Sequence, residues 1–375
     1  MAAHSSVASI KKHFRRLIDP RVVGRTKHRL IDLLVMALCG IIANCDDWPD
    51  IALFARQRAD WFRRFLALPG GTPAHDTFER VFAALNPRAL EACCLQWLRV
   101  VAGLAGIEHI AIDGKSLRGS ASSKLGALHV VSAWATQAHV SLGQVAVEGK
   151  GNEITAIPKL LELLDLDGAL VTIDAIGCQK AIAKKVVARG GAYALVVKAN
   201  QERLLADIQE TVTRALEGEL PAWRVRQCTT TERGHGRLEE RSCVVIEDVR
   251  GIRDRSAWSQ LRVVGMCRRE RTVNDQTTSE VCYFIGSRRM AARRYLAALR
   301  NHWGIENNLH WQLDVSFRED ECRARRDHGP ANLSVIRRFV LGLLKRDTSC
   351  RKGIEIKRIK CAGNDDYREK VLFKC

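Results

Sequence analysis

The sequence predicts an α/β fold in which helices flank a mixed sheet, with an N-terminal helical domain and a β-rich insertion. Two observations lead to this prediction. Between residues 106 and 215, short apolar runs typical of buried strands alternate with runs of helical spacing. From 216 to 288, β-type runs follow one another without a convincing helix between them. A hairpin joins antiparallel strands and a connecting helix joins parallel ones, so that the two together give a mixed sheet.

The first 105 residues are expected to be basic and helical. Residues 1–29 carry eight Lys or Arg side chains against one acid, Asp19, which predicts a basic N-terminal arm. In residues 30–105, apolar side chains recur at helical spacing, and the Pro69-Gly70-Gly71 sequence interrupts them. Short helices rich in Arg fit a DNA-binding domain of the helix-turn-helix type. A plain helical bundle that supports the rest of the chain fits equally well.

The remaining elements follow in the order strand, hairpin, helix, strand, helix, strand. We expect strands over 109–113, 129–134, 140–147, 169–174 and 192–198, and helices over 154–164 and 179–188. Residues 106–215 thus form the first part of the core, and 216–288 form the β-rich insertion. Residues 289–347 return to helical spacing and complete the core, and 348–375 form a basic tail.

Charge points to the class of partner. The chain has 60 Lys and Arg against 42 Asp and Glu, a formal charge of +18, which favours nucleic acid over an anionic membrane. The longest apolar run, 33–43, is too short to cross a bilayer, and we therefore expect no membrane association and a cytoplasmic location. The 13 cysteines show no CxxC pair, which argues against a zinc ribbon or a disulfide framework.

Two acids mark a candidate site. Asp113 and Asp174 each end a predicted strand, and sites in α/β sheets form at strand ends. An acid directly after a buried apolar run is costly unless it meets a counter-charge, and Mg²⁺ is a natural one. Because Asp also caps helices and starts turns, either residue alone has a structural explanation. Two such Asp residues on neighbouring strands of a basic protein favour a functional explanation over a structural one.

A third candidate lies on a predicted helix, where His302, Glu306 and His310 share one face. One interpretation is a zinc site with His and Glu ligands. Another is a single carboxylate pointing at a metal that the two Asp residues already hold, with the neighbouring His and Arg side chains near a phosphate. A solvated helix surface would also explain the pattern.

With these residues assembled, nearly the whole chain resembles the DDE transposases of bacterial insertion sequences, of the ISAs type that includes the H-repeat-associated proteins. The segments that carry the resemblance are AIDGKSLRG (111–119), NEITAIP (152–158), VTIDA (171–175), GHGR (234–237) and 302–315. Their number and order make the match specific. The part from His28 through Trp48 to residues 73–78 resembles the associated N-terminal domain of the same family.

The resemblance implies an RNase H-like core with the β-rich insertion before the last catalytic helix. It assigns Asp113, Asp174 and Glu306 as the three catalytic acids, which would hold two Mg²⁺ ions (Mn²⁺ being the other candidate) for phosphoryl transfer. Should one of Glu319, Asp320 or Glu321 approach the two Asp residues in place of Glu306, the third assignment would change.

Related transposases carry an Arg four residues before the Glu and a Lys seven after it, where this chain has His302 and Leu313. Arg300, six before the Glu, is a partial substitute for the missing Arg. The basic and amide side chains expected to contact DNA are Lys115, Arg118, Lys198, Asn200, Gln201, Arg300 and His302.

The function implied by the resemblance is that of a transposase that binds double-stranded DNA, both element ends and target, and cuts and joins strands. By analogy it works as a homo-oligomer on two ends. Two alternatives remain open. One is a DNA-binding protein derived from a transposase that has lost activity, and the other is a different RNase H-like nuclease.

Overall fold

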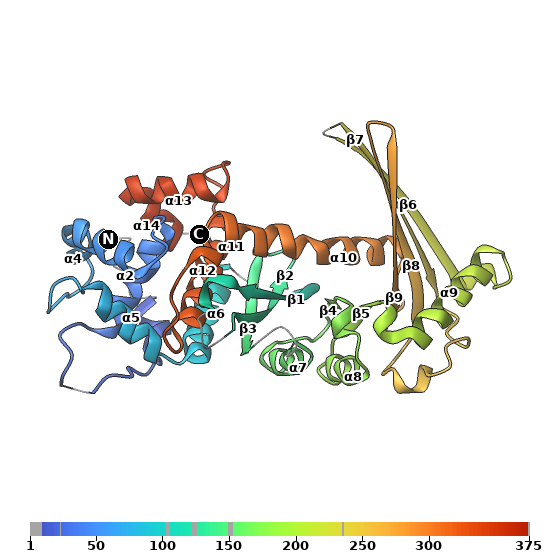
Figure 1. Cartoon of the computed structure of the whole chain (residues 1–375), viewed down its shortest axis with the longest axis horizontal. Coiled ribbons are helices and arrows are strands. Elements are labelled where there is room, and N and C mark those ends of the chain that lie inside the picture. Colours follow the sequence, from blue (N-terminus) through green and yellow to red (C-terminus); the bar gives the residue numbers. More distant parts are fainter. Residues whose placement is uncertain are drawn as a thin grey trace.

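A computed structural model describes residues 10–22, 24–102, 106–121, 126–148, 153–234 and 236–373. Residues 1–9 of the expected basic arm, as well as Asn152 and His235 from the family-like segments, lie outside the described residues. Figure 1 shows an elongated molecule with a helical body at one end, a sheet in the middle and long strands at the other end. The strands are β1 (His109–Leu117), β2 (Leu128–Ala135), β3 (Val140–Glu148), β4 (Leu170–Ile173), β5 (Ala192–Val197), β6 (Val225–Gly234), β7 (Arg237–Ile246), β8 (Val263–Val273) and β9 (Gln276–Gly286).

All nine strands belong to one mixed sheet with the order β3-β2-β1-β4-β5-β9-β8-β7-β6. Strands β1, β2 and β3 form an antiparallel meander, while β4 pairs parallel with both β1 and β5. This order and direction of the first five strands define an RNase H-like core. The predicted α/β mixed sheet is therefore confirmed.

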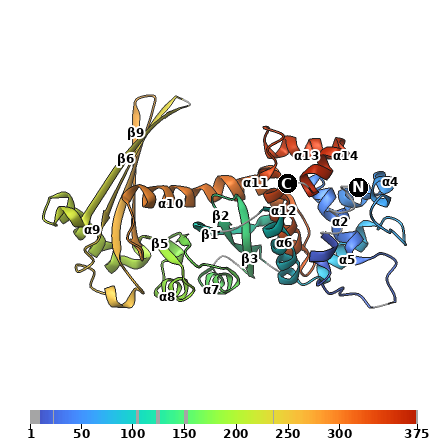
Figure 2. The same cartoon turned by 180° about the vertical axis from the view of Figure 1, so that it is seen from behind.

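The β-rich segment extends the core sheet. Strand β9 pairs antiparallel with β5, from Ala194↔Gly286 to Val197↔Tyr283, and β8, β7 and β6 follow in order. This pairing is expected because β5 is buried along its whole length. Without β9, the backbone N–H and C=O groups on the second edge of β5 would have no hydrogen-bond partners. The far ends of β6 to β9 project well beyond the helices, as Figure 2 shows from behind.

Helices cover both faces of the central strands. The ones that position the site are α7 (Glu153–Leu163), α8 (Lys180–Ala188), α9 (Glu202–Leu216), α10 (Ala292–Ile305) and α11 (Trp311–Val315). Side chains of β4 and β5 alternate between two apolar clusters: Leu170 and Ala194 pack with α10, whereas Val171 and Leu195 pack with the helices of the opposite face. Burial on both faces explains why the sequences of these strands are continuous apolar runs.

Both ends of the chain build the helical body (Figure 1). It contains α2 (Leu30–Ile42), α3 (Trp48–Gln57), α4 (Ala59–Arg63), α5 (His75–Ala84), α6 (Pro87–Ala102), α12 (Gly329–Arg346), α13 (Ile354–Gly363) and α14 (Asp365–Phe373). Part of the predicted N-terminal arm also packs into the core, through Ile10, Phe14 and Leu17.

The predicted basic tail is instead a pair of packed helices in its described part. Arg358 is fully buried and donates to the Ile41 carbonyl at 2.7 Å and to Asp46 Oδ1 at 2.7 Å. The Arg368 guanidinium lies 4.1 Å from the ring centre of Trp61. The basic side chains that suggested a solvated tail thus bind carbonyl oxygens, a carboxylate and an aromatic ring inside the fold.

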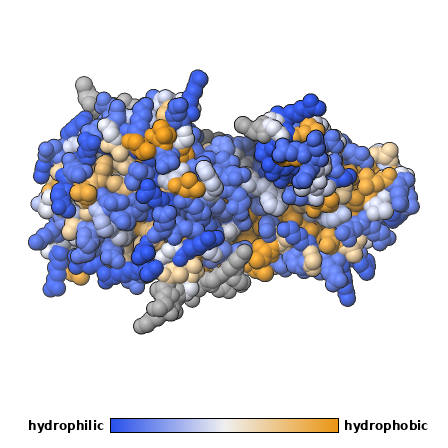
Figure 3. Space-filling view, turned by 45° about the horizontal axis from the view of Figure 1, so that its top comes forward, coloured by the Kyte–Doolittle hydropathy of each residue, from blue (hydrophilic) through white to orange (hydrophobic). Residues whose placement is uncertain are grey.

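Hydrophilic side chains cover most of the face shown in Figure 3, and apolar residues gather there in smaller patches. Among the described helices, none has both the length and the apolar character needed to cross a membrane.

Candidate active site

The parallel pairing of β1 with β4 brings the two predicted acids together. The register pairs Ile112 with Ile173, and Asp113 and Asp174 are the next residues on each chain segment. Asp174 ends its strand and accepts a hydrogen bond from the Ile176 amide at 2.7 Å, which starts a 3-10 turn. Asp113 lies where β1 continues past the end of β4. Both carboxylates therefore lie at one edge of the parallel pair.

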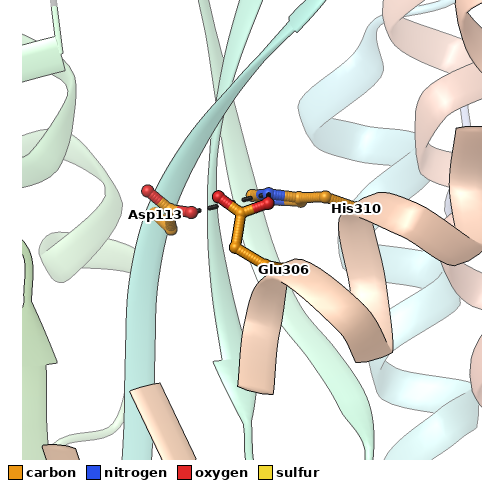
Figure 4. A group of neighbouring side chains, drawn as sticks. All are labelled: Asp113, Glu306 and His310. Carbon is orange, nitrogen blue, oxygen red and sulfur yellow. Dashed lines mark ion pairs between the residues drawn. The ribbon is translucent and has the colours of Figure 1, made fainter. Parts of the chain in front are cut away.

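The third acid comes from the helix that crosses this edge. Helix α10 passes into a π-helical turn over Glu306–His310 before α11 begins. Figure 4 shows the side chains of Glu306 and His310 directed at Asp113. His310 Nδ1 lies 3.5 Å from Asp113 Oδ2 and 3.6 Å from Glu306 Oε2. Single π turns within helices are often found at functional sites.

The charges at this edge are poorly compensated by the chain itself. Burial raises the pKa of Asp113 to about 6, and the nearby Glu306 and Asp174 carboxylates act in the same direction, although His310 opposes them. The neighbouring His310 lowers the pKa of Glu306. Ionised carboxylates gathered in a partly buried position require a positive partner.

These residues fit a divalent cation. One ligand atom from each of Asp113, Glu306 and His310 lies within 4.8 Å of the others. Carboxylate oxygens suit Mg²⁺ and Mn²⁺, and imidazole nitrogen suits transition metals. Asp174 lies outside this tightest group but is close enough to influence the pKa of Asp113.

The alternative acids for the third position are engaged elsewhere. Glu319 is buried and accepts a hydrogen bond from Arg338 Nη1 at 3.2 Å. Asp320 accepts one from Lys115 Nζ at 3.0 Å, and Glu321 is exposed. The structure thus brings Glu306 to Asp113, and not these three acids.

Two of the side chains expected to contact DNA lie in β1 or directly after it. Lys115 is buried, with Nζ at 2.7 Å from Asp314, 3.0 Å from Asp320 and 3.5 Å from Glu319, which differs from the expected DNA contact. Arg118 has 84% of its side chain exposed, and its Nε lies 3.5 Å from Asp320 Oδ2.

Lys198, Asn200 and Gln201 follow β5. The Asn200 amide group donates to the Ala175 carbonyl at 2.6 Å, and that of Gln201 donates to the Cys178 carbonyl at 2.9 Å. Both side chains thus fix the loop after Asp174, where the sequence suggested phosphate or base contacts. Lys198 is exposed at the end of its strand.

The two candidates before Glu306 point in different directions. His302 is buried, and its Nδ1 lies 3.2 Å from Thr172 Oγ1, which also bonds His109. Burial lowers the pKa of His302 to about 4, so that a neutral imidazole joins α10 to β4 where a DNA contact was expected. Arg300 is half exposed and pairs with Glu232 of β6, away from the carboxylates.

Sequence reasoning placed His310 on the same helix face as Glu306 and considered it as a zinc ligand, but did not assign it to the site of the three acids. Its i+4 spacing from Glu306 was the available signal.

Comparison with known families covers most of the chain. A family model described as "Transposase DDE domain" matches residues 104–341, and one described as "DDE_Tnp_1-associated" matches residues 11–98. The "Putative transposase YncI" of Escherichia coli O157:H7 is 36% identical, covering 99% of this chain and 96% of its own. The "H repeat-associated putative transposase YhhI" of Escherichia coli K12 is 33% identical, with 97% of each chain covered.

A solved structure with the description "piggyBac transposase synaptic complex with hairpin DNA" aligns with a TM-score of 0.40 and 11% identity. The alignment covers 100% of this chain and 78% of that one.

Proposed function

The chain belongs to the DDE transposase family, and from that premise we propose that it is the transposase of a bacterial insertion sequence. In this proposal it binds the element ends and catalyses metal-dependent strand cleavage and strand transfer. The observation that carries the proposal is the meeting of Asp113, Asp174 and Glu306 at one edge of the sheet.

Each acid is proposed as a metal ligand, with two Mg²⁺ or Mn²⁺ ions as the cofactor. Bound divalent ions would neutralise phosphate charge and stabilise the attacking and leaving oxygens of an in-line displacement. The chain itself supplies the orientation. Asp113 is fixed within the sheet, the amide of Ile176 holds the Asp174 carboxylate, and the π turn directs Glu306 at the strand.

The proposed partner is double-stranded DNA, from both the element ends and the target. The charge of +18 supports phosphate binding, which makes affinity fall steeply as salt is raised. Exposed basic residues such as Arg118 and Lys198 are available for these contacts. Because two ends must be joined, we propose a homo-oligomer on DNA.

The test is a cleavage assay on DNA that carries the element's own ends, with Mg²⁺ or Mn²⁺. Asp174→Ala and Glu306→Ala should each lose more than about 100-fold in cleavage, since even changes around metal ligands cost 10–100-fold. Their DNA affinity should stay within about threefold of the wild type, because a ligand change leaves the phosphate contacts in place. The exposed acid Glu321 is the matched control, and Glu321→Ala should cut normally.

The other outcomes discriminate between the remaining functions. Specific binding of the ends without cutting under any metal condition would identify a transposase-derived DNA-binding protein. Cutting that ignores the ends, or that acts on RNA, would identify another RNase H-like nuclease.

A further inference from the structure

His310 has no role in the three-acid scheme, yet it occupies the centre of the site. Only 5% of the residue is exposed, and its Nδ1 atom lies within 3.6 Å of a carboxylate oxygen of both Asp113 and Glu306 (Figure 4). It comes from the same π turn as Glu306, so that one local feature of the helix presents both side chains to β1.

The imidazole is buried without a hydrogen bond of ordinary length. Its Nδ1 atom is 3.5 Å from Asp113 and 3.6 Å from Glu306, beyond the 2.7–3.2 Å typical of a nitrogen donor. In the part of the chain that the structure describes, its Nε2 atom is buried and has no hydrogen-bond partner. Burying a polar group under these conditions is costly. A cation next to the carboxylates would satisfy the Nδ1 atom, which is the ring nitrogen that faces them.

The distances suit a shared cation. Ligand atoms about 2.0–2.2 Å from one ion lie about 3.0–3.5 Å from each other in tetrahedral or octahedral arrangements. The observed 3.5 and 3.6 Å are close to that range, so that shifts of a few tenths of an ångström would complete the set.

We propose that His310 is a metal ligand together with Asp113 and Glu306, and that its nitrogen makes this site prefer Mn²⁺ to Mg²⁺. The chemical reason is that Mg²⁺ favours an all-oxygen shell, whereas imidazole strengthens binding of first-row transition ions. This inference rests on the proposed function in that it concerns the same metal centre, and it names the ion that the centre selects.

Metal binding to the purified full chain tests the inference without DNA. Titration calorimetry would compare Mn²⁺ and Mg²⁺ for the wild type, His310→Ala and the more conservative His310→Gln. Loss of the ligand should raise the Kd for Mn²⁺ at least about 10-fold, in the range seen for changes at metal sites. The Kd for Mg²⁺ should change less than about threefold, because an ion with an all-oxygen shell makes no use of the imidazole. His75→Ala, at a histidine with a half-exposed side chain, is the matched control and should bind both ions normally.

Pulsed electron paramagnetic resonance of bound Mn²⁺ supplies a direct readout. The wild type and His75→Ala should show coupling to a histidine ¹⁴N nucleus, and both His310 variants should lose it while circular dichroism shows them folded. Absence of the coupling in the wild type would overturn the inference and leave an ion pair between His310 and the carboxylates. Equal weakening of Mn²⁺ and Mg²⁺ binding would also overturn it.

The two proposals fail separately. A chain that cuts element ends with no ¹⁴N coupling refutes the histidine ligand alone. A chain that shows the coupling and never cuts refutes the active transposase alone.

Discussion

Glu319→Gln removes the only acid that pairs with the buried Arg338 in the described structure. Glu319 is 2% exposed and Arg338 is 2% exposed, and their closest atoms are 3.2 Å apart. Although burial alone would raise the pKa of Glu319, the neighbouring Arg338 and Lys115 hold it below its usual value. Gln keeps the shape of the side chain and takes away its charge, so that the substitution isolates the electrostatic contribution.

The expected cost follows from burial. Removing one partner of a buried ion pair destabilises a protein by about 3–5 kcal/mol, because the other charge stays buried without compensation. Lys115 keeps two other carboxylates, Asp314 and Asp320, so that Arg338 accounts for most of the loss. Adding Arg338→Met to Glu319→Gln should therefore cost less than the sum of the two single changes, by about 1–3 kcal/mol.

Urea denaturation of the four proteins in this cycle measures both quantities. The matched control is Asp60→Asn at an exposed pair, where the side chains of Arg63 and Asp60 are 58% and 97% exposed, and it should cost less than about 1 kcal/mol. If Glu319→Gln cost no more than this control, or if the double change were additive, the reasoning would be refuted. Below its unfolding transition, Glu319→Gln should still bind Mn²⁺. Loss of binding by a folded variant would contradict Glu306 as the third acid.

Two further predictions concern the core. Burial raises the pKa of Glu91 to about 8, and above that pH the folded chain must ionise a buried carboxyl group. As the pH rises from 5 to 9, the free energy of unfolding of the wild type should therefore fall by about 3–5 kcal/mol relative to that of Glu91→Gln. Urea curves at several pH values check this, and a difference independent of pH would contradict it. A Cβ at Gly114 would lie 2.5 Å from His129 Nε2 and 2.7 Å from Glu153 Oε1, two atoms that already pair with each other. Gly114→Ala should therefore shift β1 beside Asp113 and lower the rate of DNA cleavage more than about 10-fold. Gly363→Ala, with open space at its Cβ, is the control, and equal cleavage by both variants would argue against this coupling.

Sequence patterns predicted the strands that carry the acids because those strands are buried on both faces. Residues 110–112 and 169–173, which precede Asp113 and Asp174, are almost wholly apolar, which only a covered central strand explains. Parallel neighbours then place the residues after their ends at one edge, so that the pairing of Asp113 with Asp174 was predictable.

The partners of the polar side chains were not predictable, because they come from distant segments. Lys115 meets acids about 200 positions later in the chain, and Asn332 donates to carbonyls near residue 85. A basic or amide side chain next to a candidate acid looks the same in the sequence whether it binds DNA or fixes a loop. The burial of Lys115 and the bonds of Asn200 and Gln201 depend on tertiary packing that no local pattern records.

The position of Glu306 depends on both ends of the molecule. Arg300, earlier on the same helix, pairs with Glu232 of β6, while Asn308 in the π turn accepts a hydrogen bond from Lys345 of α12 at 3.0 Å. The helix that carries the third acid is thus held by the long strands on one side and by the helical body on the other (Figure 1). Because the other two acids are fixed in the sheet between these parts, a movement of either part would change the distance from Glu306 to Asp113. The geometry of the proposed metal centre is therefore a property of the whole chain and not of the core sheet alone.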